Sequence, residues 1–438
     1  MAEQETVRHE RTGLPVRSLR AEVIEGPDAG RRLVATGDAI TIGTAPGNAL
    51  TLTDNTVSRY HAEIRSHEGR IEVEDHRSTN GTHLGGVGIY RATIPTGSVL
   101  TIGKSKVRVD DGETIEIELH GEDRIGEVLG RTPEMRRIMA TIQRTAESDA
   151  AVLLHGEVGT GKSIIARAIH DSGPRAEKPF EVVDCSSLMP TLVASELFGH
   201  EKGAFPGAED AHTGALERAS GGTVLLQEIG ELPPPLQASL HSALERKTFR
   251  RVGGTKTMPL DVRVLGTSKR DLREEVNQGK FRAELYFRLA VLTIRVPALR
   301  ERASDIPLLI EAFLKEAGRS DVDKIVPPEV MESLKSYRWP GNVQELKNFV
   351  EAAIAMGAPP PLDADGRGIG QGLTVELTLH NLTRETYHDT RDKVLFEFEK
   401  IYFPRLLDRT RGNVAQAARE ANMDRSYLIQ LLKKHRMK

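Results

Sequence analysis

The chain contains the stretch Gly156-Glu157-Val158-Gly159-Thr160-Gly161-Lys162-Ser163 between an apolar run, Ala151-Val-Leu-Leu, and a helical stretch at residues 164–170. The stretch fits the phosphate loop G-x-x-x-x-G-K-[ST], which needs a strand before it and a helix after it. Glycines let backbone N–H groups face a phosphate, Lys162 adds a positive charge at its β/γ oxygens, and the Ser163 hydroxyl can hold Mg²⁺. We therefore expect an ATP and Mg²⁺ site here. The alternative is a glycine-rich turn without a chemical role.

Three further apolar runs, at residues 180–183, 223–226 and 262–265, alternate with stretches of helical spacing. This alternation predicts an α/β domain with crossover helices. We expect the domain to span residues 128–357, with the α/β part reaching about residue 300 and a helical lid at residues 301–357.

Four motifs in this region resemble the AAA+ domain of bacterial enhancer-binding proteins, the sigma-54-dependent transcriptional activators. They are Leu197-Phe-Gly-His-Glu-Lys-Gly-Ala-Phe-Pro-Gly-Ala, Gln227-Glu-Ile-Gly-Glu-Leu-Pro, Phe281-Arg-Ala-Glu-Leu-Tyr-Phe-Arg-Leu and Trp339-Pro-Gly-Asn-Val-Gln-Glu-Leu. The resemblance implies a ring-forming ATPase in which Glu228 polarises the attacking water. It also implies that Arg282 and Arg288 reach the neighbouring subunit's nucleotide. The other interpretation of these arginines is a solvated helix face.

The sequence departs from that family at four functional positions. Gln227 replaces the aspartate that supports Mg²⁺, Lys269 replaces a polar sensor asparagine, and Gln344 replaces an arginine of the lid motif. In the sigma-factor loop, Gly203-Ala204-Phe205-Pro206-Gly207-Ala208, proline replaces the family's threonine. Four such changes favour impaired hydrolysis and an impaired contact with sigma-54. An active ATPase that remodels the sigma-54 RNA polymerase holoenzyme for open-complex formation remains the alternative.

Residues 20–119 contain short strands of period two, including Ala39-Ile-Thr-Ile and Thr114-Ile-Glu-Ile-Glu-Leu, separated by turn pairs such as Asp111-Gly112. This pattern predicts a β-sandwich. Its motifs, at residues 42–48, 57–64 and 75–82, resemble the forkhead-associated (FHA) domain, which binds phosphothreonine. The resemblance implies phosphopeptide contacts from Ser58, Arg59 and Asn80, with His61 bracing the loop. The family's main phosphate-binding arginine is Thr44 here, so we expect weak phosphothreonine binding or, alternatively, a protein-contact module that gates the ring.

The segment from Arg411 to Lys438 resembles the Fis-type helix-turn-helix of the same activators, and residues 391–438 form the predicted DNA-binding domain. Seven basic and two acidic residues in this segment are the electrostatic signature of a duplex DNA partner. One predicted helix buries Val414, Ala417 and Ala418, and a second buries Leu428, Leu431 and Leu432. The predicted DNA-binding residues are Asn413, Arg425, Ser426, Tyr427, Gln430, Lys433 and Lys434.

The rest of the sequence sets limits on the class of protein. The chain has 438 residues, a net charge of −3 and a single cysteine, Cys185, which we expect in the core of a cytoplasmic protein. No stretch approaches 18 uninterrupted apolar residues, which argues against a membrane-spanning helix. Residues 1–19 are expected to be a disordered tail and residues 358–390 a linker. The resemblance implies a homo-oligomer, from a dimer to a hexameric ring, or a mixed ring with active relatives.

Overall fold

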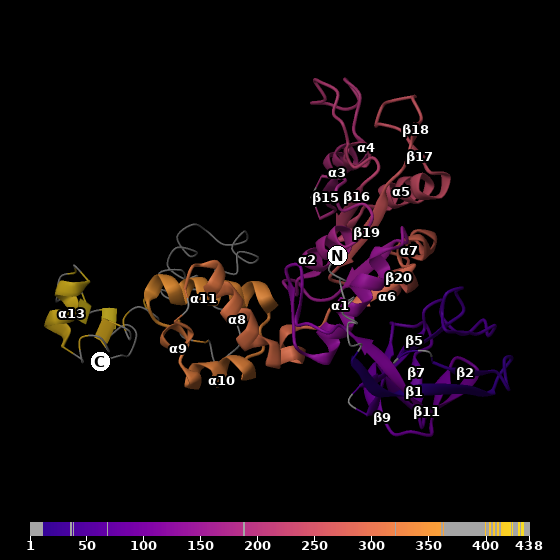
Figure 1. Cartoon of the computed structure of the whole chain (residues 1–438), viewed down its shortest axis with the longest axis horizontal. Helices are drawn as coiled ribbons and strands as arrows, with labels where there is room; N and C mark the ends of the chain where they lie inside the picture. Colours follow the sequence, from indigo (N-terminus) through magenta and orange to yellow (C-terminus); the bar gives the residue numbers. More distant parts are fainter. Residues whose placement is uncertain are drawn as a thin grey trace, which may run out of the picture. The chain divides into compact units, whose positions relative to one another are not determined.

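The structure is a computed structural model. It describes residues 12–360, apart from residues 36, 38, 68, 187, 188 and 320, together with residue 362. Nearer the C-terminus it describes residues 399, 403, 406, 407, 410, 413–421, 423, 428, 429, 431 and 432. The chain divides into two compact units, Met1–Ile369 and Gly370–Lys438 (Figure 1).

The first region is a β-sandwich, as the alternating strands predict. One sheet has the order β2-β1-β11-β10-β7-β8 and the other has the order β4-β3-β5-β6-β9. Apolar side chains from both sheets, including Ile40, Ile64 and Val107, fill the space between them. The strands are β1 (Thr12–Glu25), β2 (Arg32–Val34), β3 (Ala39–Gly43), β4 (Leu50–Thr51), β5 (Ala62–His67), β6 (Arg70–Asp75), β7 (Thr82–Leu84), β8 (Val87–Ile89), β9 (Arg91–Ile94), β10 (Ser98–Ile102) and β11 (Ser105–Leu119).

Two expectations for this sandwich were wrong. Strand β1 begins at Thr12, so residues 12–19 are not a disordered tail. They pair with residues 111–119 of β11. Without this pairing, the backbone groups on that side of β11 would lack hydrogen-bond partners from a neighbouring strand. Asp111-Gly112 is not a turn, because β11 runs through it opposite a register shift in β1. A Cβ at Gly112 would lie 2.2 Å from the Ser18 hydroxyl, so glycine permits the close approach of the two strands.

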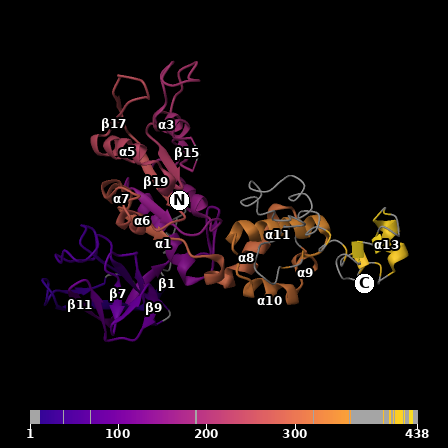
Figure 2. The ribbon, with the colours of Figure 1, turned by 180° about the vertical axis from the view of Figure 1, so that it is seen from behind.

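A short hairpin, β12 (Arg124–Ile125) and β13 (Val128–Leu129), leads into the predicted α/β domain. Its five strands are all parallel, in the order β15-β16-β19-β14-β20. They are β14 (Val152–His155), β15 (Phe180–Asp184), β16 (Thr223–Gln227), β19 (Arg263–Ser268) and β20 (Leu292–Arg295). The helices of this part are α1 (Pro133–Ala146), α2 (Lys162–Asp171), α3 (Pro190–Phe198), α4 (Ala215–Arg218), η1 (Ile229–Glu231), α5 (Pro234–Arg246), α6 (Leu272–Asn277) and α7 (Ala283–Leu289), with a hairpin of β17 (Thr248–Phe249) and β18 (Met258–Pro259) after α5 (Figure 2).

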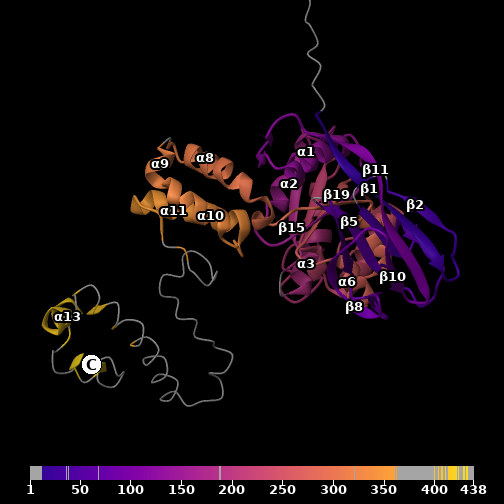
Figure 3. The same cartoon turned by 90° about the horizontal axis from the view of Figure 1, so that it is seen from below.

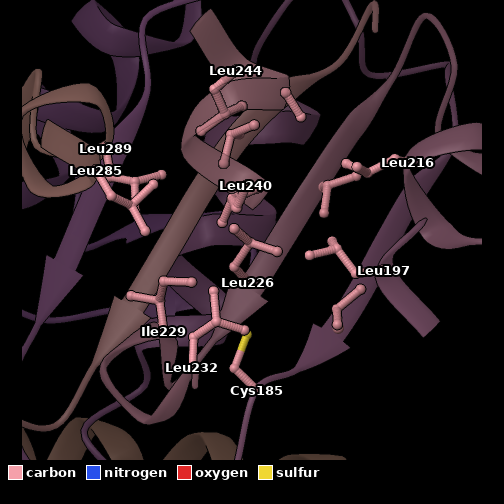
Figure 4. Packing of buried hydrophobic residues seen from close by; sticks show 14 of the residues in the cluster. Cys185, Leu197, Leu216, Leu226, Ile229, Leu232, Leu240, Leu244, Leu285 and Leu289 are labelled. Carbon is pink, nitrogen blue, oxygen red and sulfur yellow. The ribbon is translucent and has the colours of Figure 1, made fainter. Parts of the chain in front are cut away.

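Helices cover both faces of this sheet, which explains why its central strands β14 and β16 are mostly apolar. On β16, Val224 and Leu226 pack into the cluster formed with α3 to α7, whereas Leu225 packs into the cluster formed with α1 and α2. The predicted burial of Cys185 is confirmed: it lies in the first of these clusters (Figure 4), and burial raises the pKa of its thiol to about 12.

The helical lid is confirmed (Figure 3). It has its own core around Trp339 and Phe349. Its helices are η2 (Leu299–Asp305), α8 (Ile306–Glu316), α9 (Val322–Ile325), α10 (Pro328–Ser336) and α11 (Asn342–Met356). In the second unit, α13 (Val414–Glu420) is described. Most of the predicted linker lies outside the described residues. No helix in the part of the chain that the structure describes is long and apolar enough to cross a membrane.

Candidate functional site

The predicted phosphate loop connects the end of β14 to the start of α2, as its sequence requires. Gly159 and Gly161 have φ angles of +76° and +100°, a region that favours glycine. A Cβ at Gly159 would lie 2.2 Å from the carbonyl oxygen of Gly341 in the lid. The loop borders a pocket of about 440 Å³, which residues 158–163, Gln227, Glu228 and Gln344 help to line. The structure therefore brings the predicted ATP-binding residues together.

Lys162 and Glu228 lie side by side in this pocket. The Lys162 ammonium donates to the carbonyl oxygens of Gly156 at 2.8 Å and Glu157 at 2.9 Å, and it lies 3.7 Å from the Glu228 carboxylate. Burial lowers the pKa of Lys162, and Glu228 opposes this shift. Glu228 has a φ angle of +50°, and its carboxylate accepts a hydrogen bond from the Lys269 backbone N–H at 2.9 Å. The predicted water-polarising carboxylate is thus at the pocket.

Gln227 contacts the residue that was predicted to hold Mg²⁺. Its side-chain amide donates to the Ser163 hydroxyl at 2.9 Å. An amide adds no negative charge beside this hydroxyl, whereas Mg²⁺ sites in proteins are built with carboxylates. Lys269, at the sensor position, directs its ammonium to Glu231 at 3.0 Å. The pocket therefore has the groups that suit a phosphate, but it offers a cation less negative charge than an aspartate at position 227 would.

The lid closes the pocket through residues that the sequence analysis did not single out. Asn342, fully buried with a φ angle of +54°, donates to Glu157 at 3.1 Å and to the carbonyl oxygen of Val158 at 2.9 Å. Arg302 donates to the carbonyl oxygen of Thr160 at 2.8 Å, and burial lowers its pKa to about 10. Gln344 donates to Asn348 on its own helix. Asn342 lies in the motif that begins at Trp339, and this membership is the one feature of the sequence that could have indicated its role.

Arg282 and Arg288, which are predicted to contact the nucleotide of a neighbouring subunit, lie away from this chain's own pocket, as that role would require. Arg282 precedes α7 and Arg288 lies near its end, and both are exposed. Arg282 is 3.7 Å from Glu284, and Arg288 donates to the carbonyl oxygen of Leu244 at 2.9 Å. The contact with a second subunit stays a prediction.

The predicted sigma-factor loop forms a tight turn at residues 203–208. The Ala208 N–H donates to the carbonyl oxygen of Phe205 at 3.0 Å, and Gly207 has a φ angle of +99°. Proline followed by a residue of positive φ is the pattern of a type II turn, so Pro206 suits this conformation. The Phe205 ring packs against His200, with centroids 4.8 Å apart.

The predicted phosphopeptide residues gather at one edge of the sandwich. The Ser58 hydroxyl accepts from the Thr79 N–H at 2.9 Å, Asn80 donates to the carbonyl oxygen of Thr56 at 2.7 Å, and Arg59 is exposed. His61 is fully buried, accepts from the Ser58 N–H and lies 3.3 Å from the carbonyl oxygen of Gly81. The structure thus supports the bracing role expected for His61.

The second unit places the two predicted apolar faces in one cluster: Val414, Ala417 and Ala418 pack with Leu428, Leu431 and Leu432. Asn413 accepts a hydrogen bond from the Gln416 N–H at 3.2 Å and so caps α13. The other predicted DNA-binding residues lie outside the described residues: Arg425, Ser426, Tyr427, Gln430, Lys433 and Lys434.

Comparison with known families agrees with this arrangement. The Sigma-54 interaction domain matches residues 128–295, the AAA+ ATPase lid domain matches residues 300–365, and the FHA domain matches residues 40–103. The first two matches correspond to the α/β part and the lid, and the third lies within the sandwich.

Individual relatives are similar over more than 300 residues. The Nif-specific regulatory protein of Azotobacter vinelandii is 41% identical over 310 residues, which cover 69% of this chain and 59% of that protein. The transcriptional regulatory protein ZraR of Escherichia coli (strain K12) is 40% identical over 305 residues, which cover 69% of this chain and 67% of that protein. A crystal structure of NtrX from Brucella abortus in complex with ADP is 32% identical, with a TM-score of 0.52, and the match covers 72% of this chain and 69% of that one.

Proposed function

The chain belongs to the family of sigma-54-interacting transcriptional regulators, and on this premise we propose that it is a cytoplasmic, ATP-binding and DNA-binding regulator that hydrolyses ATP slowly. The contact between Gln227 and Ser163 carries the proposal. Backbone donors of residues 156–161, with Lys162, suit a triphosphate, and NtrX, a similar protein, has been crystallised with ADP and with ATP.

Slow hydrolysis follows from the residues around this loop. Mg²⁺, when bound, neutralises charge on the phosphates, and Ser163 would hold it with Gln227 as a neutral neighbour. Glu228 remains as the carboxylate that can accept a proton from water. The Lys269 ammonium pairs with Glu231 and the Gln344 amide donates to Asn348, so the polar end of each side chain already has a partner outside the phosphate loop.

An active ATPase that remodels the sigma-54 holoenzyme is the second candidate. Glu228, Arg282 and Arg288 are all present, and the lid closes on the phosphate loop through Asn342. These features support hydrolysis in a ring in which each subunit supplies arginines to the next. Gln227 weighs against this candidate, because it places a neutral amide rather than a carboxylate beside the Ser163 hydroxyl.

The partners of this function follow from the other domains. The basic segment at residues 411–438, with one described helix and a shared apolar cluster, supports duplex DNA as one partner. The exposed edge at Ser58, Arg59 and Asn80 supports a phosphothreonine protein that binds weakly. A homo-oligomer, or a mixed ring with active relatives, would give Arg282 and Arg288 a nucleotide to contact.

Two measurements on the purified full chain test the proposal. Titration calorimetry with ATP and Mg²⁺ should show binding, and steady-state phosphate release should be at least about tenfold slower than in an active family member. Binding with turnover equal to that of the active member would favour the second candidate. Absence of binding would contradict both.

A further inference from the structure

The FHA sandwich packs onto the α6–α7 region of the AAA+ domain through an interface that we call the joint. Asn277, at the end of α6, donates from its side-chain amide to the carbonyl oxygens of Tyr60 at 2.6 Å and His76 at 2.9 Å. One amide therefore holds two separate loops of the sandwich. The joint consists of Tyr60, Glu63 and His76 from the sandwich and Arg273, Asn277 and Tyr286 from the AAA+ domain.

A buried ion pair reinforces the joint. Arg273 is 7% exposed and donates to Glu63 of β5 and, at 2.7 Å, to Asp271. Burial alone would raise the pKa of Glu63, but the charges of Arg273 and Arg65 outweigh it and hold that pKa well below its usual range. Both partners are therefore charged, and undocking the sandwich would break this ion pair while Arg273 keeps Asp271 and Glu63 keeps Arg65 as partners.

Tyr60 adds an apolar contact at the same place. It is 6% exposed and belongs to the hydrophobic cluster of the AAA+ domain rather than to that of the sandwich. Its ring meets the Tyr286 ring edge to face, with centroids 4.8 Å apart. The next residue toward the N-terminus is Arg59, which is exposed and is one of the predicted phosphopeptide residues.

Residues 268–277 connect the joint to the nucleotide pocket. At the start of this segment, the carbonyl oxygen of Ser268 accepts from the Gly156 N–H at 3.2 Å, and the Lys269 N–H donates to Glu228. In its middle, Asp271 caps α6 by accepting from the Arg273 N–H at 2.8 Å. Its last residue is Asn277. One short segment thus contacts the phosphate loop at one end and the FHA loops at the other.

We propose that docking of the FHA sandwich and binding of nucleotide are positively coupled through residues 268–277. The inference rests on the proposed ATP-binding function. A phosphate loop whose neighbours are already ordered loses less conformational freedom when a nucleotide binds, so docking strengthens binding. Coupling between sites is reciprocal, so a bound nucleotide tightens the joint by the same factor.

Hydrogen exchange on the unaltered full chain tests the reciprocal direction. Addition of Mg–ADP should slow exchange of the amides at residues 58–61 and 76–77 by about fivefold or more. Protection of residues 156–163 without any change in the two FHA loops would overturn the coupling. If neither region changes, the nucleotide site itself is wrong, and the coupling fails with it.

Variants of the joint test the forward direction. Asn277→Ala and Glu63→Gln should each raise the Kd for Mg–ADP by about fivefold or more. The matched control is Glu22→Gln, which removes a charge that pairs with Arg32 and Arg108 in the same sandwich, outside the joint; its Kd should stay within about twofold of the unaltered value. Unchanged affinity in a joint variant whose FHA loops exchange faster would refute the proposal.

Discussion

Gln227 is the residue at which our proposal separates the binding of a nucleotide from its hydrolysis. Its amide reaches the Ser163 hydroxyl at 2.9 Å, so the hydrogen-bonding geometry of the site is kept. What the residue lacks is negative charge, and a cation bound nearby would be stabilised less by an amide dipole than by a carboxylate.

Replacing Gln227 with aspartate should therefore raise the rate of hydrolysis. We expect Gln227→Asp to increase steady-state phosphate release by at least about tenfold, or about 1.4 kcal/mol in the barrier. Gln227→Asn is the matched control, because it shortens the side chain equally but adds no charge. Equal rates in the two variants would assign the effect to shape, and no effect in either would assign the main defect to Lys269 or Gln344.

Thr44 presents a similar case at the FHA edge. Its N–H donates to the carbonyl oxygen of Ser58 at 3.1 Å, so the backbone of the loop is in place and only the side chain differs from the resembled family. A hydroxyl offers a phosphate one neutral hydrogen bond, whereas a guanidinium offers two charged ones.

Thr44→Arg should accordingly strengthen binding of phosphothreonine peptides. A charged hydrogen bond contributes about 1.5–3 kcal/mol, so the Kd should fall by about tenfold or more in calorimetric titration of a phosphothreonine peptide library. Thr44→Gln, which is long but uncharged, should give little gain. Tight binding by the unaltered domain would mean that Arg59 or another cation already performs this role.

At the scale of elements, Asp54 ties the loop after β4 to the turn between β10 and β11. It is 2% exposed and accepts hydrogen bonds from Thr56, from the Lys104 N–H and from the Ser105 hydroxyl. Burial would raise its pKa, but these hydrogen bonds outweigh it and lower the pKa to about 2. The neighbouring residues 57–61 carry the predicted phosphopeptide contacts.

Asp54→Asn should destabilise the sandwich by about 2 kcal/mol at pH 7, the free energy equivalent of its lowered pKa. Because the pKa in the folded state lies below that in the unfolded state, this stabilisation is present above about pH 4 and is lost as the pH falls toward 2. Urea unfolding at both pH values measures it. Asp210→Asn, at a side chain 93% exposed, is the control. If the difference in unfolding free energy between Asp54→Asn and the unaltered protein is as large near pH 2 as at pH 7, the assignment is wrong.

Elements with a local signal were predictable, and those that depend on distant partners were not. The strand β14 and helix α2 follow from a short sequence because both bury apolar residues on either side of the glycine-rich phosphate loop. The start of β1 was missed because its partner, residues 114–119 of β11, lies about 100 residues away and the N-terminal sequence is polar. Asn342 and Asn277 were missed for the same reason, since their amides bind backbone groups of other domains or loops.

At the scale of the whole molecule, the three proposed functions belong to separate parts of the chain. The phosphopeptide edge and the nucleotide pocket lie within one compact unit, and the basic segment lies in the other. DNA binding should therefore be unaffected by substitutions at the nucleotide site. Substitutions at the joint, in contrast, should change the affinity for nucleotide.

Duplex DNA binding should depend on the last residues of the chain. Deleting residues 413–438 should abolish it in a mobility-shift assay. Arg425→Ala should relax sequence preference, with a loss of about 1–3 kcal/mol if this side chain reads a guanine. Lys433→Ala should instead weaken binding to all sequences and reduce the salt dependence, as expected for a phosphate contact. Unchanged binding after the deletion would show that the assignment is wrong.

Activation at a sigma-54 promoter depends on the loop and the nucleotide site together, and we expect this protein alone not to achieve it. In the resembled family the loop threonine contacts the sigma factor, and here Pro206 offers neither a hydroxyl nor a backbone N–H. Pro206 and Gly207 also suit a type II turn, which should resist the movement that a nucleotide-driven loop needs.

Open-complex formation on supercoiled DNA, with sigma-54 RNA polymerase, ATP and the full chain, measures this outcome. The unaltered protein and each of the single variants Pro206→Thr and Gln227→Asp should give few open complexes, and the double variant should give clearly more. Pro206→Ala with Gln227→Asp is the matched control, because alanine restores the N–H and frees the turn but supplies no hydroxyl. Open complexes from the unaltered protein at the rate of an active family member would contradict the prediction. Recovery with alanine as good as with threonine would show that turn rigidity, and not the missing hydroxyl, limits the contact.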